Sequence, residues 1–77
     1  MASKTKISNR IRRLRFDCGE MTQQELAGKI GVTRQTVNAI EGAKYSPTLE
    51  LAFRIADALG VPLVEVFSYD DKVAPED

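Results

Sequence analysis

Residues 23–40 read QQELAGKIGVTRQTVNAI, and this stretch decides the fold. Thr22 stands directly before it and can cap a helix, while Glu25, three residues later, can complete a capping box. Thr33 can cap a second helix, and Gly31 between the two suits the left-handed backbone of a tight turn. Apolar residues recur at the spacing of two crossing helices, namely Leu26, Ile30, Val37 and Ile40. The pattern predicts a helix-turn-helix.

The second helix of this motif has an unusual outer face. When its apolar residues face inward, a rotation of about 100° per residue turns a polar set toward solvent. That set comprises Arg34 on the flank, with Gln35, Asn38 and Ala39 directly outward. Arginine can pair with guanine, glutamine or asparagine with adenine, and alanine can touch a thymine methyl. We therefore expect base reading in a major groove. The alternative is an ordinary antiparallel helix pair with a solvated, amide-rich face.

The wider sequence resembles a known family. The segments NRIRRLR, MTQQELAGKIGVTRQTVNAIE, KYSPTLELAFRIADALGVP and EVF are similar to the Cro/cI-type, or lambda-repressor-like, regulators, in a branch of very small bacterial and archaeal proteins. The resemblance covers about residues 7–69. It implies a five-helix domain that binds a palindromic operator in double-stranded DNA as a homodimer, through its third helix, and usually represses transcription. It also implies a salt bridge between Arg15 and Glu41.

Phosphate contacts are expected to supply most of the binding energy. The N-terminus of the first helix of the motif has free backbone N–H groups and a favourable dipole. By resemblance, Gln23 is a phosphate contact, whereas Arg34 and Gln35 read bases. The predicted phosphate contacts are Thr22, Gln23, Gln24, Thr33, Lys44 and Tyr45. The family usually has glycine directly before this lysine, but here the order is Gly42, Ala43, Lys44, which leaves the loop geometry open.

Charge is distributed unevenly along the 77 residues, although the formal net charge is zero. Residues 1–44 have nine Lys/Arg and four Asp/Glu, a net charge of +5, whereas residues 45–77 have two and seven, a net charge of −5. The basic half contains the motif, so this dipole would steer it toward DNA phosphates. The alternative is a basic head and an acidic tail that only keep the protein soluble.

The other elements follow from apolar spacing and from glycine and proline positions. Three further helices are expected: one at about residues 8–18, one that begins within residues 46–48 and stops at residue 60, and one at 62–67. Short terminal strands are expected at 5–7 and 66–69. The predicted fold is thus all-α with a possible terminal strand pair. Residues 1–69 form the DNA-binding domain, and 70–77 form an acidic, flexible tail.

Apolar positions predict a core and a dimer surface. The expected core residues are Ile7, Ile11, Leu14 and Cys18 in the first helix, Leu49, Ala52, Phe53, Ile55, Ala56 and Leu59 in the fourth, and Leu63, Val66 and Phe67 in the fifth. Cys18 is interpreted as a small hydrophobe, with redox sensing as the alternative. Leu51, Ala58 and Val64 lie outside these stripes. They predict an exposed apolar patch for a twofold contact, unless they are scattered surface residues.

Several function classes are excluded by composition. No apolar run approaches the ~20 residues of a membrane span, and the start lacks a signal peptide, so we expect a cytoplasmic protein without membrane contact. There is no histidine and one cysteine, and no catalytic constellation or phosphate-binding glycine loop is visible. We expect no enzyme activity, metal, cofactor or small-molecule ligand. The competing function is an antitoxin or protein-interaction module whose acidic half binds a toxin.

Overall fold

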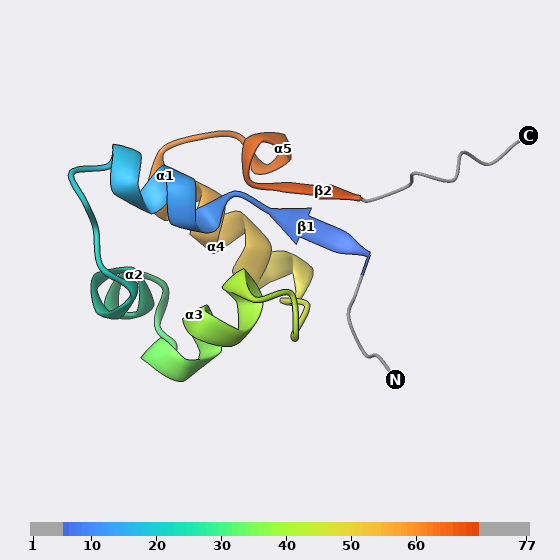
Figure 1. The fold of residues 1–77 in the computed structure, drawn as a ribbon, viewed down its shortest axis with the longest axis horizontal. Coiled ribbons are helices and arrows are strands. Elements are labelled where there is room, and N and C mark those ends of the chain that lie inside the picture. The colour runs from blue at the N-terminus through green and yellow to red at the C-terminus, as the bar shows by residue number, and fades with distance from the viewer. Residues whose placement is uncertain (1–5, 70–77) are drawn as a thin grey trace, which may run out of the picture.

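The computed structural model describes residues 6–69, which form five helices and one strand pair (Figure 1). The elements are β1 (Ile7–Asn9), α1 (Ile11–Asp17), α2 (Gln23–Ile30), α3 (Arg34–Glu41), α4 (Leu49–Leu59), α5 (Leu63–Val66) and β2 (Phe67–Tyr69). The predicted helical fold with paired terminal strands is confirmed. The expected strand start at Thr5 and the expected tail at 70–77 lie outside the described residues.

Local capping produces the helix-turn-helix as the sequence predicts. Thr22 Oγ1 accepts the Glu25 N–H at 3.0 Å, and the Glu25 carboxylate accepts the Thr22 N–H at 2.9 Å. Thr33 Oγ1 accepts a backbone N–H at the start of α3. Gly31 ends α2 with φ +77°, a conformation that a residue with a Cβ adopts only with strain. These contacts orient α3 across α2.

The first helix is shorter than predicted because its expected first turn belongs to the sheet. Ile7–Asn9 pair antiparallel with Phe67–Tyr69, so α1 starts at Ile11. Asn9 Oδ1 accepts the Ile11 N–H at 3.1 Å and satisfies a donor of the first helical turn. The prediction of a buried Cys18 is wrong. The helix ends at Asp17, and Cys18 lies at its C-terminal edge, where the side chain is exposed and its Sγ donates to Leu59 O at 3.5 Å.

Apolar side chains from all five helices meet in one core. The buried members are Ile11, Met21, Leu26, Ala27, Ile30, Val37, Ile40, Ile55, Ala56, Leu59 and Val66. In Figure 1, α4 crosses the middle of the molecule, where it contacts both α2 and α5. The core therefore fixes α2 and α3 on one side of α4.

The two flanks of α4 are the reverse of what was predicted. Leu49 and Phe53, expected in the core, are 68% and 54% exposed. Leu51 and Ala58, expected outside, are partly buried and pack against the core, and the C-terminal end of α2 borders this flank at Ala58. An Arg54 guanidinium N–H donates to the Ile30 carbonyl there at 3.3 Å. The other flank borders an apolar groove, whose lining is Ile7, Pro47, Leu49, Ala52, Leu63 and Phe67.

The loop after α3 closes with alanine in a position that favours glycine. Ala43 has φ +59°, whereas Gly42 has φ −82°. The Lys44 N–H donates to Ala39 O and the Ala43 N–H donates to Ile40 O, both at 3.0 Å, which is the Schellman pattern of a helix end. The displaced glycine therefore leaves the loop closure intact, but Ala43 adopts a strained backbone conformation.

Exchanging these two residues, Gly42→Ala with Ala43→Gly, should stabilise the domain by about 1 kcal/mol by relieving the strain at Ala43. The composition is unchanged, so the entropy of the unfolded chain changes little. A Cβ at residue 42 would lie 3.4 Å from Asn38 O, an ordinary contact. Thermal unfolding should show a midpoint about 4–8 °C higher, with Gly42→Ala as the single-site control. A lower midpoint for the exchanged protein would refute the interpretation that Ala43 is strained in this loop.

Candidate nucleic-acid interface

The outer face of α3 is free, as the helical spacing predicts. Arg34, Gln35 and Asn38 are exposed, whereas Ala39, which was predicted to point directly outward with them, is partly buried. Val37 and Ile40 on the opposite face are 1% and 2% exposed. The core therefore holds α3 by its apolar side and leaves its arginine and amide side chains at the surface, where they can reach base edges.

The start of α2 leaves two backbone donors unused within the helix. The capping box engages the N–H groups of Thr22 and Glu25. Gln23 and Gln24 occupy the first two helical positions, whose N–H groups have no acceptor inside α2. The side chains of Thr22 and Gln24 are exposed at this helix end, and that of Thr33 is exposed at the start of α3. Such a helix end attracts an anion such as a DNA phosphate.

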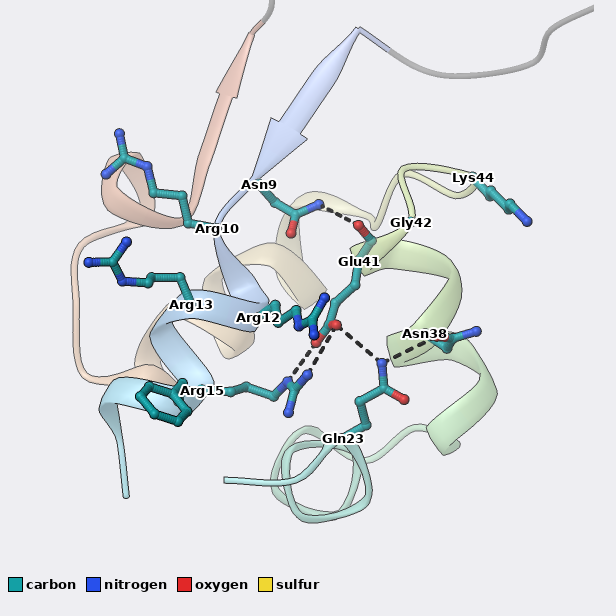
Figure 2. A pocket seen from close by; sticks show the side chains of 11 residues that line it. Asn9, Arg10, Arg12, Arg13, Arg15, Gln23, Asn38, Glu41, Gly42 and Lys44 are labelled. Atoms are coloured by element: carbon teal, nitrogen blue, oxygen red, sulfur yellow. Dashed lines mark hydrogen bonds and ion pairs between the residues drawn. The ribbon is translucent and has the colours of Figure 1, made fainter. Parts of the chain in front are cut away.

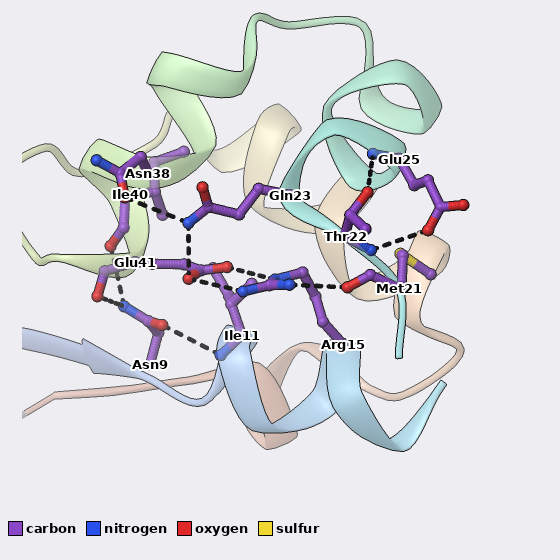
Figure 3. A network of polar contacts seen from close by, with 10 residues as sticks. All are labelled: Asn9, Ile11, Arg15, Met21, Thr22, Gln23, Glu25, Asn38, Ile40 and Glu41. Carbon is purple, nitrogen blue, oxygen red and sulfur yellow. Dashed lines mark hydrogen bonds and ion pairs between the residues drawn. The ribbon is translucent and has the colours of Figure 1, made fainter. Parts of the chain in front are cut away.

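A mostly buried ion pair connects α1 to α3. Arg15 Nε lies 2.6 Å from Glu41 Oε2, and its Nη2 donates to Oε1 at 3.2 Å (Figure 3). The third donor, Nη1, bonds Met21 O at 2.7 Å, directly before α2. The two side chains are 14% and 10% exposed. The salt bridge implied by the family resemblance is therefore present, and it connects three segments of the domain.

Gln23 belongs to the same network through its side chain. Its Nε2 donates to Glu41 Oε1 at 3.1 Å and to Asn38 Oδ1 at 3.3 Å. The two hydrogens of one carboxamide are thus both engaged. The donor that Gln23 has left for a phosphate is its backbone N–H. Sequence reasoning did not foresee this link between the start of α2 and the exposed face of α3.

An open groove lies between α1 and α3 (Figure 2). It brings together three of the predicted contact residues, Gln23, Asn38 and Lys44. Arg34, Gln35 and the other predicted contacts are not part of its lining. Tyr45 is 46% exposed and lines a separate small hollow with Ile7 and Phe67.

The groove also contains arginines that sequence reasoning counted only as net charge. Arg10, Arg12 and Arg13 line it. Arg13 lies 3.7 Å from Asp17 across one helical turn, whereas Arg10 and Arg12 form no ion pair with any of residues 6–69. The expected Arg15–Glu41 pair could have revealed them, because it places α1 beside α3. The groove therefore contains two arginines that pair with no acidic residue within the described range.

Other site chemistries find no support in the part of the chain that the structure describes. Within residues 6–69, no cluster of three or more His, Cys, Asp or Glu side chains is arranged to hold a metal ion. None of the helices in this range has the length and apolar character needed to span a membrane.

Comparison with known proteins agrees with this geometry. A family model described as Helix-turn-helix matches residues 19–66. The chain is 53% identical over 51 residues to an HTH-type transcriptional regulator of Methanocaldococcus jannaschii, covering 66% of this chain and 77% of that protein. It is 39% identical over 61 residues to the cryptic phage CTXphi transcriptional repressor RstR of Vibrio cholerae, covering 79% of this chain and 54% of RstR.

A crystal structure of a Bacteroides fragilis protein has the same fold, with a TM-score of 0.72 at 22% identity over 80% of this chain and 98% of that one. The chain therefore belongs to the Cro/cI-type helix-turn-helix family. It is a DNA-binding transcription regulator and not an enzyme.

Proposed function

We propose that the protein is a repressor that binds a palindromic operator as a homodimer, with α3 of each subunit in the major groove. The observation that supports this most is the exposed row of Arg34, Gln35 and Asn38 on a helix whose other face is buried. The similarity to RstR, which is described as a transcriptional repressor, supports repression rather than activation.

Residues of α3 make the base contacts, and residues around α3 make the phosphate contacts. We assign base reading to Arg34, Gln35, Asn38 and Ala39, and phosphate contacts to Thr22, Gln23, Gln24, Thr33, Lys44 and Tyr45. Arg10 and Arg12 line the groove and form no ion pair with any of residues 6–69, and they extend the phosphate-binding surface. Phosphate contacts hold the protein on any duplex, whereas the α3 side chains distinguish one sequence from another.

The homodimer contact is proposed at the apolar face of the acidic C-terminal half. Val64, predicted for this contact, is 78% exposed, but Leu51 and Ala58 are partly buried and pack against the core. Leu49 and Phe53 replace them as exposed apolar side chains. A twofold contact there leaves the basic half free for DNA and lets the two α3 helices reach half-sites about 34 Å apart.

Different classes of variant should separate base reading from phosphate binding. Gln35→Ala should cost about 1–3 kcal/mol per half-site at one base position and relax the preference there. Lys44→Ala should weaken all duplexes alike. Selection of bound sites from randomised duplex DNA, followed by competition binding, measures both effects. An unchanged sequence preference in Gln35→Ala would refute its role as a base-reading residue.

A further inference from the structure

The orientation of the Asn38 carboxamide follows from a chain of hydrogen bonds that begins at a charge. The Glu41 carboxylate is an acceptor only, so the Gln23 atom that faces it at 3.1 Å must be the amide nitrogen. The same nitrogen lies 3.3 Å from Asn38, which must therefore present its oxygen. Arg15 holds Glu41 in place through two contacts, at 2.6 and 3.2 Å. Arg15 therefore fixes Glu41, Glu41 orients the Gln23 amide, and Gln23 orients the Asn38 amide.

This order turns the amino group of the Asn38 side chain outward. Its Nδ2 points away from Gln23 (Figure 2), while its Oδ1 is already engaged. The side chain therefore offers hydrogen-bond donors to the solvent and to any base beside it. Bidentate pairing of asparagine with adenine uses Oδ1 as an acceptor beside Nδ2 as a donor. The hydrogen bond from Gln23 already occupies one of the two lone pairs of Oδ1 and ties this oxygen to α2, so single donation by the outward Nδ2 becomes the favoured contact.

We propose that Gln23 is a positioning residue that turns the amino group of Asn38 toward the groove, so that Asn38 reads bases mainly as a hydrogen-bond donor. Asn38 then favours guanine or thymine, whose major-groove edges offer O6 and N7 or O4 as acceptors. It disfavours cytosine and adenine, whose amino groups N4 and N6 replace the O4 of thymine and the O6 of guanine. Adenine retains only N7 as an acceptor on this edge. This inference rests on the proposed insertion of α3 into the major groove, and it specifies which bases one of its residues selects.

The test compares base preferences at one position. Asn38→Ala identifies the base pair that Asn38 contacts, because the preference is lost there. At this pair, selection from randomised duplex by the wild-type protein should favour guanine or thymine over adenine and cytosine by about tenfold. Gln23→Met keeps the side-chain length but removes both donors, so the Asn38 carboxamide can turn over. The ratio should then fall to about twofold or less, with preferences at other positions unchanged.

Gln24→Met is the matched control. Gln24 is the next residue of α2, is exposed, and makes no hydrogen bond to Asn38 in the structure. It should leave the ratio at its wild-type value. A general loss of phosphate contacts or of stability would lower affinity for all duplexes without changing the ratio, so the readout is specific to positioning.

Two results would overturn the inference while leaving the proposed function intact. One is a wild-type preference for adenine at the pair that Asn38 contacts. The other is an unchanged ratio in Gln23→Met. A wild-type protein that binds all duplexes equally would instead refute sequence-specific operator binding itself, and the two failures are therefore distinguishable.

Discussion

Replacing Arg15 by methionine is expected to remove about 3–5 kcal/mol from the free energy of unfolding, because it leaves the Glu41 carboxylate buried without its counter-ion. Both side chains are mostly buried, at 14% and 10% exposure, and Arg15 also satisfies Met21 O. A domain of this size has a total stability of about 4–12 kcal/mol, so the expected loss is at least a quarter of it. Urea unfolding followed by circular dichroism measures the change.

Two controls separate the buried charge from the loss of an arginine in general. Arg13→Met removes a surface pair with Asp17, whose side chains are 76% and 56% exposed, and should change stability by less than about 1 kcal/mol. Combining Arg15→Met with Glu41→Leu removes both charges and should recover most of the loss. Equal effects of Arg15→Met and Arg13→Met would contradict the structural role of the buried pair.

A charge at the proposed dimer face should have a comparably large effect on operator binding. Val64 is 78% exposed in the single subunit, so Val64→Glu should leave the fold intact. In the dimer the same charge would be buried without a partner, and the protein should become monomeric. Each half-site then binds separately, so the apparent affinity for the paired operator should fall by about 10²–10⁴. Affinity for an isolated half-site should change by about twofold or less.

Val64→Lys is the control for repulsion by net charge. A lysine adds attraction to DNA, so loss of paired-site affinity with both charges would identify the interface as the cause. Sedimentation measures the oligomeric state directly. A monomeric wild-type protein at high concentration, or a Val64→Glu protein that still dimerises, would be incompatible with this contact.

The helix-turn-helix could be predicted because its signals are local. The Thr22–Glu25 capping box joins residues three positions apart, and Gly31 acts on its own backbone. Such contacts form between neighbours in sequence, so their geometry depends little on the rest of the chain. The outward face of α3 was predictable for a related reason, since a helix with a strong apolar stripe has one way to bury it.

The errors arose where distant segments meet. α1 begins late because Ser8 pairs with Ser68, and spacing along the first helix contains no information about a strand sixty residues away. Likewise, the spacing located the buried stripe of α4 but not the flank that α2 covers. Leu51 and Leu49 lie on opposite flanks of that stripe. The side from which the other helices approach decides that Leu51 packs against the core while Leu49 stays exposed.

The DNA-binding face likewise combines features that the local sequence determines with features that depend on contacts between distant segments. From the sequence one can infer that α3 exposes arginine and amide side chains, because their positions follow from a repeat within eight residues. The orientation of the Asn38 amide depends on tertiary structure, because its partner Gln23 lies fifteen residues earlier on α2 and is itself oriented by Glu41. A hydrogen bond between helices requires their relative placement, which the shared core determines and no local pattern encodes.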